Sequence, residues 1–173
     1  RDQSVYQSMS KVDRASRLLY LNKTCFNGLF RVNSSGEFNS PFGHYKNPNI
    51  VNEPVLRAVN KYLTKNDIIL YSEDFEKILE RVPNNGFVYL DPPYDPVSDT
   101  ASFTGYNKGG FDKEEQKRLK RCCDLLDKRG VKFMLSNSAT EFIKSLYGDY
   151  DVTIVKAKRI INSNVNGRGT VDE

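Results

Sequence analysis

The sequence is poor in the side chains that build metal sites and disulfide frameworks. It contains three cysteines and one histidine in 173 residues. Cys122 and Cys123 are adjacent on a predicted helix, where they are poorly placed to bond each other, and the set has no metal-ligand spacing. We therefore predict reduced core cysteines and no metal site.

Long hydrophobic runs are missing as well. No stretch approaches the roughly 18 apolar residues that a membrane span needs, and the first residues lack the apolar core of a signal peptide. The mean hydropathy is -0.60, with 38% hydrophobic residues. These absences exclude a membrane-spanning protein and predict a soluble, cytoplasmic one.

The net charge of +4 is unevenly distributed along the chain. Residues 1–66 hold 10 lysines and arginines against 4 acidic residues, a net charge of +6, whereas residues 67–173 hold 16 against 18, a net charge of -2. A basic region of this kind is expected where a protein faces a polyanion such as nucleic acid, although many surfaces with a surplus this small bind nothing.

Residues 86–94 read Gly-Phe-Val-Tyr-Leu-Asp-Pro-Pro-Tyr. The apolar run favours a strand that is buried on both faces of a parallel sheet, and the two prolines end it. Asp91 is thereby predicted at the carboxyl end of a strand, which is the edge where open α/β sheets bind ligands.

This turn can accept hydrogen bonds but has few groups that donate them. Pro92 and Pro93 have no backbone N–H, and an ionised Asp91 only accepts. A carboxylate and a nearby backbone carbonyl suit the two hydrogens of an amino group, and Tyr94 adds a ring on which a planar base can stack. The pattern predicts an aromatic amine as substrate; the alternative is a turn that merely ends a strand.

Strands and helices alternate along much of the sequence, which predicts an α/β fold. Helices are expected at residues 10–22, 53–63, 74–81, 112–130 and 139–147, and strands at 68–71, 87–90, 131–135 and 152–155. A β-hairpin is expected over 29–39, around Asn-Ser-Ser-Gly. A polar loop covers 95–110, and a further strand is expected to begin at 171–173.

The Asp-Pro-Pro-Tyr turn and several separated stretches resemble the Dam-type, D12-class adenine-N6 DNA methyltransferases over nearly the whole sequence. The resemblance implies catalytic roles for Asp91, Pro92, Pro93 and Tyr94, and methyl transfer from S-adenosylmethionine to N6 of adenine in double-stranded DNA. It also implies an α/β fold with a partial Rossmann-like methyltransferase sheet, helices on both faces and a helical and β-hairpin target-recognition region. Residues 1–53 would form that region, and residues 54–173 the C-terminal part of the catalytic domain.

The hairpin segment carries the second resemblance, over residues 22–33 and 36–45, to family members that recognise GATC. Arg31 would bond O6 and N7 of guanine in the major groove, which contributes about 1–3 kcal/mol of discrimination. His44 is a departure, because several relatives carry Arg there for a contact with the DNA backbone, and an imidazole holds phosphate less strongly than a guanidinium does. The implied DNA contacts are Asn27, Leu29, Arg31, Pro41, His44 and Tyr45.

The resemblance implies a cofactor site at Asp74, Phe75 and Asp91, with Ser136-Asn137 at the same sheet edge. The family's glycine-rich loop, which holds the methionine part of S-adenosylmethionine, has no counterpart in this sequence. We therefore expect a piece of a longer protein that lacks that segment and a final strand, binds S-adenosylmethionine poorly and is inactive alone.

Two other interpretations stay open. The chain could instead be a non-catalytic DNA-binding module, or part of a methyltransferase for another amine, such as an RNA base or a protein glutamine. The residues give no indication of the oligomeric state.

Overall fold

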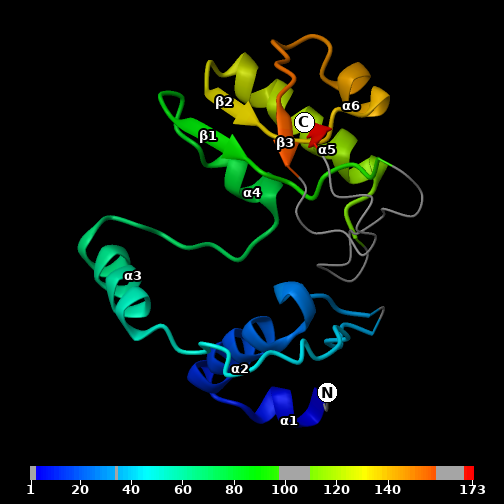
Figure 1. Cartoon of the computed structure of the whole chain (residues 1–173). Coiled ribbons are helices and arrows are strands. Elements are labelled where there is room, and N and C mark those ends of the chain that lie inside the picture. The colour runs from blue at the N-terminus through cyan, green and yellow to red at the C-terminus, as the bar shows by residue number, and fades with distance from the viewer. Residues whose placement is uncertain (1–2, 34, 98–109, 159–169) are drawn as a thin grey trace. The chain divides into compact units, whose positions relative to one another are not determined.

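The computed structural model describes residues 3–33, 35–97, 110–158 and 170–173 (Figure 1). Its contacts divide the chain into two compact units, the first formed by the described residues up to Tyr71 and the second by those from Ser72 onward. Most of the loop predicted over 95–110 lies outside the described residues. In the part of the chain that is described, no helix combines the length and the apolar character needed to cross a membrane.

Two helices open the first unit, α1 at Gln3–Ser8 and α2 at Lys11–Thr24. Ser10 caps α2, because its Oγ accepts a hydrogen bond from the backbone N–H of Asp13 at 3.1 Å. The prediction of a helix over 10–22 is confirmed, with an end at Thr24 instead of Asn22. The 3-10 turn η1 at Phe26–Gly28 follows, and α1 was not predicted.

The predicted hairpin is present as antiparallel bridges and not as two continuous strands. Val32 pairs with Phe38 and Cys25 with Phe42, each as an isolated bridge. The turn closes through Asn33, whose N–H donates to the Glu37 carbonyl at 2.9 Å. The Asn33 side-chain oxygen also accepts from the N–H of Glu37 at 2.9 Å. Side-chain bonds to the backbone therefore replace part of the strand ladder at this turn.

Helix α3 at Glu53–Lys65 begins where Glu53-Pro54 predicted, after the N-cap Asn52. The strand predicted over 68–71 does not form. Ile69 and Leu70 are 70% and 77% exposed, and no described strand pairs with this segment. An apolar run becomes a strand only where a partner strand completes its hydrogen bonds, so the prediction was wrong.

The second unit contains the parallel pair β1, at Phe87–Leu90, and β2, at Lys132–Leu135 (Figure 1). Helix α5 at Lys113–Lys128 connects them and is capped by Asp112, whose Oδ1 accepts from the N–H groups of Glu114 and Glu115 at 3.0 Å each. The predicted helix over 112–130 is confirmed.

One face of the β1–β2 pair packs on a hydrophobic core from α5 and α6, the latter at Glu141–Leu146. Val88 and Leu90 of β1 face this core, whereas Phe87 and Tyr89 are 66% and 57% exposed. The expectation that β1 is buried on both faces was wrong, because no described element covers its second face. The buried members of the core are Leu79, Leu119, Cys122, Cys123, Leu126, Val131, Ile143 and Tyr147.

The remaining elements are α4 at Phe75–Glu80 and the antiparallel pair β3, at Lys156–Lys158, and β4, at Thr170–Asp172. The strand predicted over 152–155 was placed too early. The strand forms at 156–158 because β4 pairs with those residues. Within the predicted range, Val155 extends the pairing through two backbone hydrogen bonds with Glu173, at 2.8 and 2.9 Å. The three cysteines are buried, as predicted, and carry free thiols.

Candidate active site

The Asp91–Asp95 turn leaves β1 at the same sheet edge where residues 136–140 leave β2. This follows from the parallel register, in which Leu90 lies opposite Leu135. The Ser136 N–H continues the ladder by donating to the Leu90 carbonyl at 3.0 Å. Two segments that are about 45 residues apart in sequence are therefore held together at the point where the chemistry was predicted.

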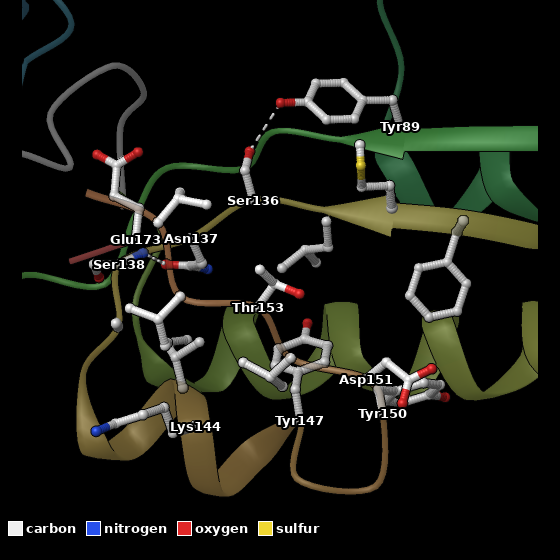
Figure 2. Close-up of a pocket in the computed structure, with 18 of the residues that line it drawn as sticks. Tyr89, Ser136, Asn137, Ser138, Lys144, Tyr147, Tyr150, Asp151, Thr153 and Glu173 are labelled. Atoms are coloured by element: carbon white, nitrogen blue, oxygen red, sulfur yellow. Dashed lines mark hydrogen bonds between the residues drawn. The ribbon is translucent and has the colours of Figure 1, made fainter. Parts of the chain in front are cut away.

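Asp91 is exposed, and Ser136 orients its carboxylate. The Ser136 hydroxyl donates to Asp91 Oδ1 at 3.0 Å, and the Tyr89 hydroxyl lies 3.1 Å from the same serine oxygen (Figure 2). One carboxylate oxygen is thus held by the residue that directly follows β2. No hydrogen bond from the described residues reaches Oδ2, which leaves that oxygen for an external donor.

Pro92, Pro93 and Tyr94 are half-buried beside it. Burial raises the pKa of the Tyr94 hydroxyl above its ordinary value, and a hydrogen bond with Ser136 offsets part of that rise. The phenol is therefore neutral at neutral pH and offers an uncharged ring next to the Asp91 carboxylate.

A buried polar network, which the sequence did not predict, holds the rest of the turn. Gln116 of α5 donates from Nε2 to the Pro93 carbonyl at 2.8 Å. Asn137 donates from Nδ2 to Gln116 Oε1 at 3.1 Å and accepts at Oδ1 from the Asp95 N–H at 2.9 Å.

Two hydroxyl groups complete this network. Ser138 Oγ donates to the Asp95 carbonyl, and Thr140 Oγ1 donates to Asp95 Oδ2 at 2.6 Å. Asp95, Gln116, Asn137 and Ser138 are all buried, with side chains that find partners inside the chain. The Ser136-Asn137 pair was predicted at this edge, whereas a single Gln in a charged helix carries no signal that it points inward.

A pocket of about 760 Å³ lies beside β2. Ser136, Asn137, Tyr147 and Glu173 are among its lining residues (Figure 2). Asp91 and the two prolines are not part of that lining. The pocket therefore borders the Asp91 turn without containing it.

Asp74 and Phe75, the predicted cofactor residues, lie at the start of α4 and are engaged by Arg118 of α5. The guanidinium donates to both Asp74 oxygens at 2.8 and 2.9 Å, and it lies 4.1 Å from the centre of the Phe75 ring. The hydrogen bond from Arg118 is the main cause that holds the pKa of Asp74 below its ordinary value.

An acid and an aromatic ring are the right chemistry for a nucleoside, but both are occupied within the chain. Asp74 also caps α4, with Oδ1 accepting from the Glu76 N–H at 3.0 Å. A ligand ring on Phe75 has to use the face away from Arg118. The described residues therefore supply at most part of a site for S-adenosylmethionine.

The six predicted DNA contacts all lie in the first unit, on η1 and the segment that follows it. Five are exposed and Leu29 is half-buried; the exposed ones are Asn27, Arg31, Pro41, His44 and Tyr45. The structure brings Asn27 and Tyr45 together, because the Asn27 N–H donates to the Tyr45 hydroxyl at 2.9 Å. Asn27 and His44 both have positive φ, 55° and 53°, which marks two tight bends.

Asp-Pro-Pro-Tyr at the carboxyl end of a parallel strand is the feature that carries the resemblance to the adenine-N6 DNA methyltransferases. Residues 1–161 match the family model of the D12 class N6 adenine-specific DNA methyltransferases. The chain belongs to this family.

The relatives it matches include two type II methyltransferases and one DNA adenine methylase. M1.LlaDCHI of Lactococcus lactis subsp. cremoris is 43% identical over 165 residues, which is 95% of this chain and 58% of that protein. M.MjaIII of Methanocaldococcus jannaschii is 50% identical over 153 residues, 88% of this chain and 52% of the relative.

The DNA adenine methylase of Escherichia coli K12 is 35% identical over 167 residues, covering 96% of this chain and 59% of the methylase. The chain thus spans between 52% and 59% of the length of these three relatives.

Proposed function

We propose that the protein to which this chain belongs transfers a methyl group to N6 of adenine in duplex DNA, at GATC, with S-adenosylmethionine as the donor. The observation that carries the proposal is the acceptor-rich turn, in which an exposed Asp91 carboxylate precedes two prolines and Tyr94, and one of its oxygens accepts no hydrogen bond from the described residues. The family and its DNA adenine methylase members support the choice of base.

Adenine has to leave the duplex before its amino group can reach this turn, at a cost of a few kcal/mol. The Tyr94 ring would hold the extruded base by stacking, which stabilises it by roughly 1–3 kcal/mol. The neutral phenol of Tyr94 suits this role, since it adds no charge next to the carboxylate of Asp91.

Asp91 Oδ2 and the Pro92 carbonyl would accept the two N6 hydrogens. This draws the nitrogen lone pair out of conjugation with the ring and directs it toward the methyl donor. When bound, S-adenosylmethionine would supply the methyl group of its sulfonium and leave as the neutral thioether, and N6 would lose one of its two hydrogens as a proton after the transfer. Positioning and support of the positive charge that develops on N6 account for the catalysis, so Asp91 acts as an acceptor and not as a nucleophile.

The same proposal assigns residues 1–53 to target recognition and residues 54–173 to the catalytic domain, with the β1–β2 pair as part of a larger Rossmann-like sheet that has helices on both faces. Arg31 would read guanine through O6 and N7, and Asn27 would bond a phosphate. Leu29 and Pro41 would pack on base edges, Tyr45 would wedge between bases, and His44 would contact the backbone.

Methyl transfer by the intact protein to a GATC duplex tests the proposal. Wild-type protein should methylate N6 of the GATC adenine and leave a scrambled duplex unmodified. Asp91→Ala should lower kcat by at least about 100-fold, the loss expected when a preorganised polar group is removed from the reacting centre. Methyl transfer that survives the substitution in folded protein would rule out the role of Asp91. In a competition assay, methylation of RNA that excess GATC duplex does not reduce would favour another substrate.

A further inference from the structure

We propose that Gln116 is a positioning residue of the methyl-transfer reaction, and that together with Asn137 it fixes which backbone carbonyl of the Asp-Pro-Pro-Tyr turn faces the substrate amine. The inference rests on the proposed function. It adds a residue on α5 to the side chains that orient the acceptors, of which Ser136 is another.

The burial of Gln116 is the first observation. Its side chain is 1% exposed, on the face of α5 that also carries Leu119 and Cys123. A primary amide in such a place loses several hydrogen bonds to water and destabilises the fold unless partners replace them. An apolar side chain would fill the same space without that cost, so the packing of α5 alone does not call for glutamine.

The partners of Gln116 are the second observation. Its amide N–H donates to the Pro93 carbonyl, and its amide oxygen accepts from Asn137, which in turn accepts from the Asp95 N–H. Pro93 and Asp95 are the two neighbours of Tyr94 in sequence. The Gln116–Asn137 pair is thus hydrogen-bonded to the backbone on both sides of Tyr94, whose ring is proposed to stack on the base.

The third observation concerns the carbonyls. Gln116 occupies the Pro93 carbonyl, whereas no hydrogen bond within the described part of the chain reaches the Pro92 carbonyl. Of the two proline carbonyls of the turn, the described residues therefore leave that of Pro92 to act beside Asp91. Ser136 holds Asp91 Oδ1, next to the proposed acceptor Oδ2. Gln116 holds the Pro93 carbonyl, next to the proposed acceptor carbonyl of Pro92.

Two substitutions separate this role from simple packing. Gln116→Met keeps the length and approximate volume of the side chain but removes both hydrogen bonds. Gln116→Glu retains an acceptor for Asn137 and removes the donor to Pro93. The matched control is Lys117→Gln, at the adjacent exposed position of the same helix.

Steady-state kinetics of the intact protein on a GATC duplex are the main measurement. We expect both Gln116 variants to lower kcat by about 10- to 100-fold, as for a misplacement of the reacting groups by up to about 1 Å, with KM for the duplex changed by less than about threefold. Lys117→Gln should keep both constants. Values are corrected for the folded fraction of each variant, measured by circular dichroism.

A second readout reports the base directly. In a duplex with 2-aminopurine in place of the target adenine, the bound probe should be brighter with Gln116→Met than with wild type, because a loosened Tyr94 ring quenches the extruded base less. A kcat per folded molecule within twofold of wild type would overturn the role of Gln116, and so would a fall in kcat with an unchanged probe signal. Wild-type protein that methylates no adenine duplex would instead refute the proposed function itself.

Discussion

At the scale of single residues, the candidate site consists of hydrogen-bond acceptors that other side chains hold in place. Asp91 could be predicted because Asp-Pro-Pro-Tyr follows an apolar run, and proline removes donors wherever it occurs. Gln116 could not, because the direction of a helical side chain depends on which face packs, and its neighbours along α5 are charged. Sequence therefore predicts the reacting group better than the residues that position it.

In the proposed function, Arg31 is the residue that would read the guanine of the target sequence. The binding preference compares GATC with a duplex in which another base replaces the contacted guanine. Arg31→Ala should reduce this preference by about 1–3 kcal/mol, which is roughly 5- to 150-fold in the ratio of the two dissociation constants. Fluorescence anisotropy with both duplexes measures that ratio. Lys46→Ala, at an exposed basic position beyond the hairpin, should weaken binding to both duplexes alike. An unchanged ratio in Arg31→Ala would contradict the assignment.

At the scale of secondary-structure elements, helices were predictable and strands depended on their partners. The helices α2, α3 and α5 each have an N-cap side chain and an apolar periodicity that are visible in the sequence. The segment 68–71 has the composition of a strand but belongs to neither sheet of the described residues, and the strand near 152–155 is shifted to match β4. The pairing that decides such cases lies far away along the chain.

Arg118 connects α4 to α5 through ion pairs to Asp74, Glu76 and Glu115. Arg118→Met should lower the melting temperature at pH 7. The pKa of Asp74 is lowered in the folded state, so its contribution to stability is present above the ordinary carboxyl pKa of about 3.9 and is lost as the pH falls below that value. The difference in melting temperature between variant and wild type should therefore shrink between pH 5 and about pH 3.

Thermal unfolding followed by circular dichroism across this pH range provides the test. Arg121→Met, at an exposed position of the same helix, is the control and should show no pH-dependent difference from wild type. A melting-temperature difference for Arg118→Met that stays constant from pH 7 to pH 3 would mean that Asp74 gains nothing from the pair.

At the scale of the whole molecule, the second unit exposes one apolar sheet face. Phe87, Tyr89 and Met134 are 66%, 57% and 53% exposed on it. On the other face lies the hydrophobic core, in which Cys123 and Leu126 are almost fully buried. The alternation of exposed and half-buried residues along β1 and β2 is the pattern of a sheet with one covered face. The sequence did not predict this, because residues 87–90 are all apolar or aromatic.

The 173-residue chain by itself should bind S-adenosylmethionine weakly. Asp74 and Phe75 already interact with Arg118, so the nucleoside has to compete for both. Isothermal titration calorimetry should detect no binding at micromolar cofactor, whereas the intact protein should bind in that range. A micromolar dissociation constant for the 173-residue chain would contradict the expectation.

The two adjacent prolines also determine which inhibitors the turn can accept. Because neither Pro92 nor Pro93 carries an amide hydrogen, a carboxylate or phosphate placed against them would face the Pro92 carbonyl oxygen and the Asp91 carboxylate, both of which repel it. Amidines and amino-substituted heterocycles have the opposite polarity. A chemical library rich in such flat, cationic fragments, and poor in acids, is therefore the appropriate source of ligands for this site.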